Sequence, residues 1–202
     1  MGFSILDGTG KGNEAGVDDR NRMLVAALTE TESNNATTQG IKYNINTGDI
    51  TLTNAVKTSV LYIKNDDNRD LVIDALIYNL GSSNSGSLDC VIDVVRNPTA
   101  GDIITNANDV AIGPNENANL NFGSSNTLEA MMYKGATGET ALSGGGVVIT
   151  TRNPSPSGRI FISPGGGFIL PKGTSLGIDF TPSTGNTSQT VQFALNVHIR
   201  DS

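Results

Sequence analysis

The 202-residue chain has one cysteine (Cys90), one histidine (His198) and no tryptophan. A single cysteine excludes an intramolecular disulfide and any zinc or iron–sulfur site built from several cysteines. A single histidine excludes a zinc site built from several histidines. It also requires any Ser-His-Asp or Cys-His catalytic arrangement to include residue 198. These absences remove many of the common catalytic and metal-binding arrangements.

Charge is sparse, and its balance is negative. Lys, Arg, Asp and Glu make up 16% of the residues, and the formal net charge is −7. Because binding to nucleic-acid phosphates requires a positive surface, nucleic acid is not an expected partner. No apolar run approaches the roughly 18 residues of a membrane helix, and the first residues lack the basic and then apolar pattern of a secretory signal. We therefore expect no membrane partner and no export.

Glycine supplies 24 residues, and Asn, Thr and Ser are abundant, which is typical of strands joined by turns. Residues 1–22 lack apolar periodicity and are predicted to form an extended N-terminal arm. Residues 23–202 are predicted to form a single domain, in which short apolar or alternating runs follow one another. This pattern predicts an all-β, antiparallel fold, and we favour a jelly-roll-like β-sandwich. The predicted strands are 23–31, 41–46, 50–53, 59–64, 71–80, 88–96, 118–122, 146–152, 159–163, 168–170, 175–181 and 190–200.

Local signals add three details to this prediction. Residues 46–49 and 65–70 contain Asn, Asp and Gly, which tolerate the backbone of a tight reversal, so both are predicted to be hairpin turns. The glycine triplets 144–146 and 165–167 are predicted to need unusual backbone angles. The apolar spacing within 126–134 predicts one short helix.

Alternation along the predicted strands assigns side chains to faces. In 190–200, the apolar residues from Val191 to Ile199 share one face, and His198 lies on the polar face, where we expect it to be exposed or to contact a subunit. Cys90 is expected to be a small buried apolar residue. Strand 71–80 is apolar on both faces, so it either lies between two layers or presents one face to a partner. Leu76 and Tyr78 are the predicted partner contacts of this strand.

Two glycine- or aspartate-rich stretches resemble ligand motifs but lack their essential residues. Residues 8–12 fit neither the phosphate-loop nor the dinucleotide-binding spacing. Residues 66–70 begin like a calcium loop but lack its Gly and its bidentate Glu, so a solvated hairpin tip is expected there. We therefore predict no catalytic, cofactor-binding or metal residues, no cofactor and no enzymatic activity.

Three stretches carry a resemblance to a known group of proteins. They are LDGTGKG at 6–12 with NRMLV at 21–25, SVLYIKNDDNRDLVI at 59–73, and FILPKGTSLGI at 168–178. Together they resemble the small virion structural proteins of tailed bacteriophages. Within that group the chain is most similar to the capsid decoration, or cement, proteins.

The resemblance implies a non-enzymatic protein that binds the outer surface of the capsid and stabilises contacts between capsid subunits. Its implied partners are the major capsid protein and other copies of itself, as a homotrimer. Its implied location is the virion exterior, after assembly in the host cytoplasm. The N-terminal arm would reach over neighbouring subunits, with Lys11, Arg20 and Arg22 as its predicted contacts. The acidic net charge suits a position away from packaged DNA.

Two other hypotheses belong to different classes. The first is a head-fibre or tail-associated module that binds receptor glycans through polar loops such as 81–86 and 184–186. Aromatic platforms for sugar rings are scarce, however, since the chain has no tryptophan and four tyrosines. The second is a hydrolase, which predicts pocket carboxylates with perturbed pKa values.

Overall fold

The chain divides into two compact units, Met1–Thr31 and Glu32–Ser202. In the first unit, β1 (Gly16–Val17) pairs antiparallel with β2 (Met23–Leu24). The predicted arm contacts Lys11, Arg20 and Arg22 lie outside the described residues. The structure is a computed structural model, and it describes residues 16–17, 23–24, 31–53, 56–83, 89–105, 110–112, 117–153, 159–163, 167–183 and 188–200.

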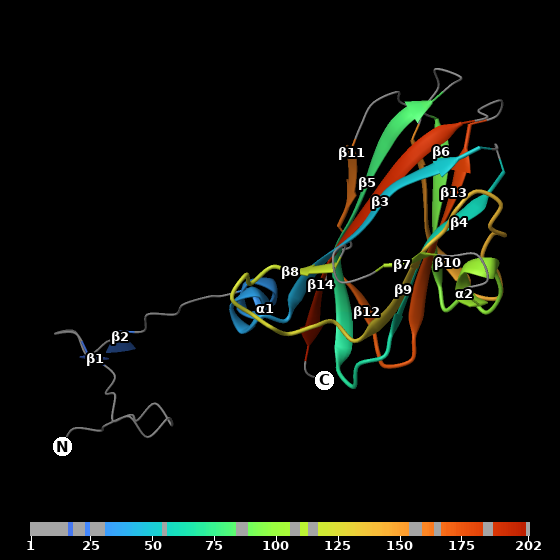
Figure 1. Cartoon of the computed structure of the whole chain (residues 1–202). Helices are drawn as coiled ribbons and strands as arrows, with labels where there is room; N and C mark the ends of the chain where they lie inside the picture. The colour runs from blue at the N-terminus through green and yellow to red at the C-terminus, as the bar shows by residue number, and fades with distance from the viewer. Residues whose placement is uncertain are drawn as a thin grey trace. The chain divides into compact units, whose positions relative to one another are not determined.

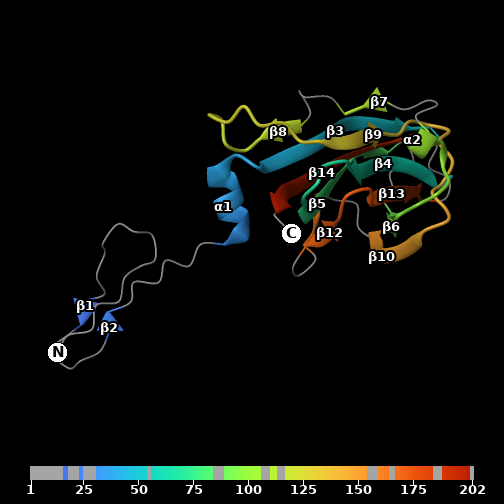
Figure 2. The same ribbon diagram turned by 90° about the horizontal axis from the view of Figure 1, so that it is seen from below.

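The second unit consists mainly of two antiparallel sheets (Figures 1 and 2). This confirms the prediction of an all-β sandwich. In spatial order, sheet I contains β10 (Gly146–Asn153), β6 (Cys90–Arg96), β13 (Ser175–Pro182), β4 (Thr58–Asn65), β9 (Ala130–Lys134) and β7 (Val110–Ala111). Sheet II contains β11 (Arg159–Ile162), β5 (Asp70–Ser83), β14 (Gln189–Arg200), β3 (Lys42–Leu52) and β8 (Asn117–Asn119), and β12 (Phe168–Leu170) also pairs with β5.

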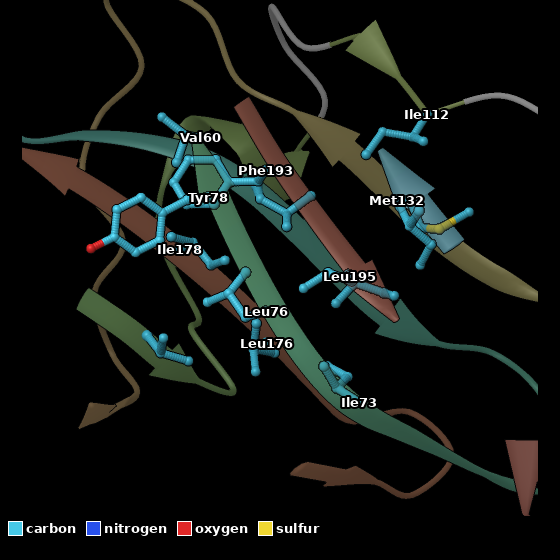
Figure 3. Close-up of a cluster of buried hydrophobic side chains, with 14 of the residues drawn as sticks. Val60, Ile73, Leu76, Tyr78, Ile112, Met132, Leu176, Ile178, Phe193 and Leu195 are labelled. Atoms are coloured by element: carbon cyan, nitrogen blue, oxygen red, sulfur yellow. The ribbon is translucent and has the colours of Figure 1, made fainter. Parts of the chain in front are cut away.

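The hydrophobic core lies between the two sheets, and Figure 3 shows part of it. The predicted inward face of β14 is confirmed, because every apolar residue from Val191 to Ile199 at alternate positions is buried. Cys90 is also buried, as expected. Strands β6 and β13 of sheet I contribute Ile92, Val94 and Phe180 from the opposite side. Alternating apolar residues in both sheets therefore account for a closed core.

Strand β5 is central to the sandwich, so the partner-contact prediction for Leu76 and Tyr78 is wrong. The two side chains are 1% and 0% exposed and belong to the core. A register shift in the pairing of β5 with β14 separates Ile73 from Leu76, so both residues point inward despite their odd spacing. Burial also raises the pKa of Tyr78. No partner can reach either side chain in the folded chain.

Residues 46–49 form a β-bulge inside β3, so the hairpin predicted there is wrong. The pairing of β3 with β14 shifts register opposite this segment, and Gly48 takes a φ of 64°. The backbone N–H of Phe193 donates to the Thr47 hydroxyl at 3.0 Å. This side-chain oxygen accepts the hydrogen bond that a backbone carbonyl of β3 would accept in a regular strand pair. Bulges and turns require similar residues, which is why the sequence pattern did not separate them.

Residues 65–70 cross between the sheets, because β4 belongs to sheet I and β5 to sheet II. The predicted hairpin is therefore wrong here as well. The side chain of Asn65 donates to the carbonyls of Arg69 and Leu170, both at 2.8 Å. Asp67 is buried rather than solvated, and its hydrogen bonds from Arg69 lower its pKa. The crossing is thus a fixed turn.

The helices also differ from the prediction. Residues 130–134 form β9, paired with β4, so the predicted helix at 126–134 is wrong. A helix that was not predicted, α1 (Glu32–Gln39), buries only Ala36 and therefore has no apolar stripe to detect. The second helix, α2, spans Asp102–Thr105. Among the described residues, no helix has the length and apolar character needed to cross a membrane.

Candidate functional site

Four large apolar side chains are exposed along the edge of the sandwich where β10 ends sheet I and β11 and β12 border sheet II. They are Val147, Val148, Phe161 and Ile169, each between 46% and 58% exposed. Figure 2 shows β10 and β12 at this edge. We call this group the apolar edge. Val148 and Ile169 line one pocket, whereas Val147 pairs opposite Val95 on the outer face of sheet I and Phe161 pairs opposite Ile77 on the outer face of sheet II. Exposed apolar side chains at one border are typical of protein contact surfaces.

A pocket of about 260 Å³ opens at the apolar edge, between the two sheets. Val148 and Ile169 form part of its rim, and Asn97 fixes its floor by pairing with the backbone of Ser175 at 2.8–2.9 Å. We call it the edge pocket. Its lining residues are Arg96, Asn97, Val148, Phe168, Ile169, Leu170, Pro171, Thr174, Ser175 and Leu176.

The local sequence explains why two consecutive valines are exposed. The pairing of β10 with β6 shifts register between Val147 and Ile149, so Val148 is the extra residue of a bulge. The preceding glycines are required, because Gly144 has a φ of 77° and a Cβ on Gly145 would lie 2.1 Å from the Arg96 carbonyl oxygen. This confirms the unusual backbone predicted for the first glycine triplet, and Gly167 in the second has a φ of 77°.

A second exposed apolar feature is Phe122, which is 97% exposed in the loop after β8. Side-chain amides hold this loop in place. Asn119 and Asn126 both donate to the Gly40 carbonyl, at 2.8 and 3.0 Å, and Asn121 donates to the Thr38 carbonyl at 3.1 Å. The loop therefore presents an aromatic ring from a fixed backbone.

His198 does not lie on an exposed face, which corrects the sequence-based expectation. Its side chain is 3% exposed, because α1 covers this part of sheet II. The Nδ1 atom lies 3.1 Å from the Asp74 carboxylate, and Nε2 lies 3.5 Å from Glu32 Oε1. Burial by itself would raise the pKa of Asp74, but the hydrogen bond and charge of His198, together with the Lys42 charge and the Ser33 hydrogen bond, outweigh burial and lower it.

A serine completes this polar cluster, but not as a nucleophile. Ser33 of α1 donates to Asp74 Oδ2 at 3.2 Å, and Lys42 donates to the Ser33 hydroxyl. In a nucleophilic triad the histidine lies between the serine and the aspartate and accepts the serine proton. Here Asp74 lies between Ser33 and His198. The arrangement attaches α1 to β5 and β14 and leaves the hydroxyl unactivated.

A second polar cluster lies on the outer face of sheet I. Asp179 is fully buried and accepts the backbone N–H of Leu142 at 3.0 Å and the Ser59 hydroxyl at 3.1 Å. Lys57 lies 3.4 Å from Asp179 and 2.6 Å from Asp93. Burial raises the pKa of Asp179, although the Leu142 hydrogen bond and the Lys57 charge act against it. The cluster is a buried carboxylate compensated by one lysine.

Replacing Lys57 with methionine should lower the free energy of unfolding by about 1–2 kcal/mol at pH 7, after discounting for the partial exposure of Lys57. The variant leaves the buried Asp179 carboxylate without its cation. Because burial raises the folded-state pKa of Asp179, its penalty develops as the pH rises from the ordinary aspartate pKa through the raised folded value, and it disappears when the group is protonated in both states. The loss should therefore shrink as the pH falls, as measured by urea unfolding between pH 7 and pH 4.

Lys64→Met is the matched control, since Lys64 pairs with the exposed Asp66 at 3.6 Å. Its unfolding free energy should stay within about 0.5 kcal/mol of the wild type. Equal effects of the two variants, or a Lys57→Met loss that does not change with pH, would contradict the assignment.

The residues proposed from sequence and the surface seen in the structure are different. Leu76 and Tyr78 are internal, and the arm lysine and arginines are outside the described residues. Sequence reasoning missed Val148, Ile169 and Phe122. Two weak signals existed: two valines directly after three glycines, and a phenylalanine directly between Asn121 and Gly123 in a loop rich in Asn and Ser.

Within the described parts of the chain, no three His, Cys, Asp or Glu side chains converge as a metal ion would require. No protein-family model, curated protein or solved structure matches the chain. The apolar edge, the edge pocket and Phe122 are apolar features at the surface of the described residues. The functional proposals below use these three features as protein-contact surfaces.

Proposed function

We propose that the chain is a non-enzymatic structural protein of a bacteriophage particle that decorates the capsid exterior and stabilises contacts between capsid subunits. The observation that carries this proposal is the apolar edge. Its four exposed apolar side chains come from three strands at one border of the sandwich. A decoration protein works by binding, and such an edge supplies apolar surface for removal from water on binding.

The strand order supports a jelly roll as the specific form of the sandwich. Counting β11 and β12 as one interrupted strand beside β5, the central strands follow the order β10-β6-β13-β4 in sheet I and β11-β5-β14-β3 in sheet II. Consecutive strands β3, β4, β5 and β6 alternate between the two sheets, as do β13 and β14. Alternation of this kind is what two interlocked Greek keys produce.

The resemblance of 6–12, 21–25, 59–73 and 168–178 to decoration proteins supplies the partner, the major capsid protein. The negative net charge is compatible with an exterior location. Many copies bound to a symmetric shell would gain avidity. A weak contact between each apolar edge and a capsid subunit would then be enough for stable decoration. The N-terminal residues Lys11, Arg20 and Arg22 remain proposed contacts of the arm.

Co-sedimentation with capsids assembled without this protein tests the proposal. The wild-type chain should pellet with the capsids at a saturable stoichiometry. The double variant Val147→Ser/Phe161→Ser should bind at least tenfold more weakly, because both side chains belong to the apolar edge and neither lines the edge pocket. Val56→Ser is the control, since Val56 is 61% exposed and lies elsewhere in the chain.

Three results would overturn the proposal. The wild type could fail to pellet with capsids, the double variant could bind as well as the wild type, or the control could lose binding equally. A positive glycan-binding screen combined with no capsid binding would favour the receptor-binding alternative.

A further inference from the structure

We propose that copies of this chain bind one another head to tail, with Phe122 of one copy inserted into the edge pocket of the next. This contact is a property of the isolated protein, and it stands independently of capsid binding. It pairs the most exposed large apolar side chain described with an apolar pocket that the same chain provides.

Phe122 is suited to insertion because its loop is already ordered. Besides the bonds to Gly40 and Thr38, the Asn119 side chain accepts the N–H of Asn121 at 2.9 Å, and the Asn121 side chain accepts the N–H of Gly123 at 3.1 Å. Ordering a flexible loop on binding opposes association, and here most of that ordering has occurred during folding. A buried aromatic ring on a fixed backbone is a frequent hot spot of protein interfaces.

The edge pocket is suited to receive a phenyl ring. Its volume is about 260 Å³, whereas an apolar cavity of about 150 Å³ is enough to bind benzene. The side chains of Val148, Phe168 and Ile169 line it with carbon, and neither Val148 nor Ile169 is fully covered in the free chain. Insertion of the ring would therefore remove apolar surface from water on both sides of the contact.

A chain cannot fill its own pocket, because the two features lie at opposite borders of sheet II. Phe122 follows β8 at one border, and β12 lies beyond β5 at the other. Four strand spacings separate Asn119 from Phe168, a distance of about 19 Å along the hydrogen-bonding direction. The contact must therefore join different copies.

The register of sheet II relates the strands that carry the two features. Pairing runs in one row from Asn119, the last residue of β8, to Tyr43, Val197, Ile73 and Phe168. Phe122 follows Asn119 by three residues, and Phe168 lines the edge pocket. A head-to-tail contact closes into a ring when successive copies are related by rotation without translation along the axis. We expect a closed ring, which has one fixed mass, rather than a filament.

Light scattering of the purified full chain tests the contact. The wild type should have a mass that is a fixed multiple of 21.0 kDa. Phe122→Ala, which removes the inserted ring, and Val148→Lys, which places a charge at the pocket rim, should each shift the protein to a monomer. Val56→Ala, which also removes an exposed apolar side chain, should keep the wild-type mass. A monomeric wild type, or a Phe122→Ala variant that keeps the wild-type mass, would overturn the proposal.

Cross-linking distinguishes a head-to-tail contact from a symmetric one. The double variant Ser125→Cys/Pro171→Cys keeps both Phe122 and Val148, because Ser125 is an exposed residue of the Phe122 loop and Pro171 is an exposed residue of the pocket lining. Treated with a short bismaleimide, it should give covalent dimers and larger species, whereas each single cysteine variant should give none. The buried Cys90 is present in every variant and controls for background cross-linking. Dimers from Ser125→Cys alone would show a symmetric contact and overturn the proposal, and so would a double variant that forms none.

Discussion

Replacing Phe193 with alanine should lower the free energy of unfolding by about 3–5 kcal/mol. Phe193 of β14 is fully buried, and its ring centroid lies 6.0 Å from that of Tyr78 in the middle of the core. Removal of the ring loses the favourable free energy of transferring it from water to the core. It also leaves a cavity that the two packed sheets cannot close. A loss of this size is a large share of the stability of an ordinary domain, about 5–15 kcal/mol.

Urea unfolding of the purified chains provides the measurement, and Phe122→Ala is the matched control. The same substitution at the 97% exposed Phe122 should change the unfolding free energy by less than about 0.5 kcal/mol, compared under conditions where both proteins are monomeric. Phe193→Leu, which keeps most of the volume, should cost less than about 1.5 kcal/mol and covers the case in which the alanine variant does not fold. Comparable losses for Phe193→Ala and Phe122→Ala would contradict the burial of one ring and the exposure of the other.

Replacing His198 with leucine should lower the free energy of unfolding by about 2–3 kcal/mol at pH 7. Leucine fills much of the imidazole volume but donates no hydrogen bond, so the half-buried Asp74 carboxylate loses its closest partner. Glu32 of α1 loses the imidazole contact at the same time. His198→Gln, which retains an N–H donor, should recover part of the loss.

The pH dependence gives this prediction a second readout. The folded-state pKa of Asp74 is lowered, so its contribution to stability is present above its ordinary pKa and is lost as the pH falls through the lower folded value. The wild type should therefore lose stability faster than His198→Leu as the pH is lowered below about 4. Parallel stability curves for the two proteins, or no loss at pH 7, would show that the His198–Asp74 contact does not stabilise the fold.

The sequence predicted what depends on alternation within a strand. The inward face of β14, the burial of Cys90 and the antiparallel sandwich all follow from apolar side chains at every second position. His198 was misplaced because α1 covers its face, and α1 has no apolar stripe that would reveal a helix. Leu76 was misplaced because a register shift in β5 changes the alternation.

The candidate binding surface could not be predicted because exposure at an edge depends on strand order. Val148 is exposed since β10 is the last strand of sheet I and contains a bulge, and the position of β10 in the sheet does not follow from the residues around Val148. The edge pocket joins residues near 96, 148, 168 and 175, which only the pairing of distant strands brings together. Phe122 could have been noticed, because its immediate neighbours Asn121, Gly123, Ser124 and Ser125 offer no apolar surface to cover it.

The position of β14 has a consequence for synthesis of the protein. β14 is the last described strand in chain order, yet it lies in the middle of sheet II, between β5 and β3. Until it emerges from the ribosome, β3 and β5 have no partner on their facing sides, and the nascent chain carries two open strand edges. Sheet II can therefore close only after translation of residues 189–200, and a ribosome stalled before that point would hold a chain prone to aggregation.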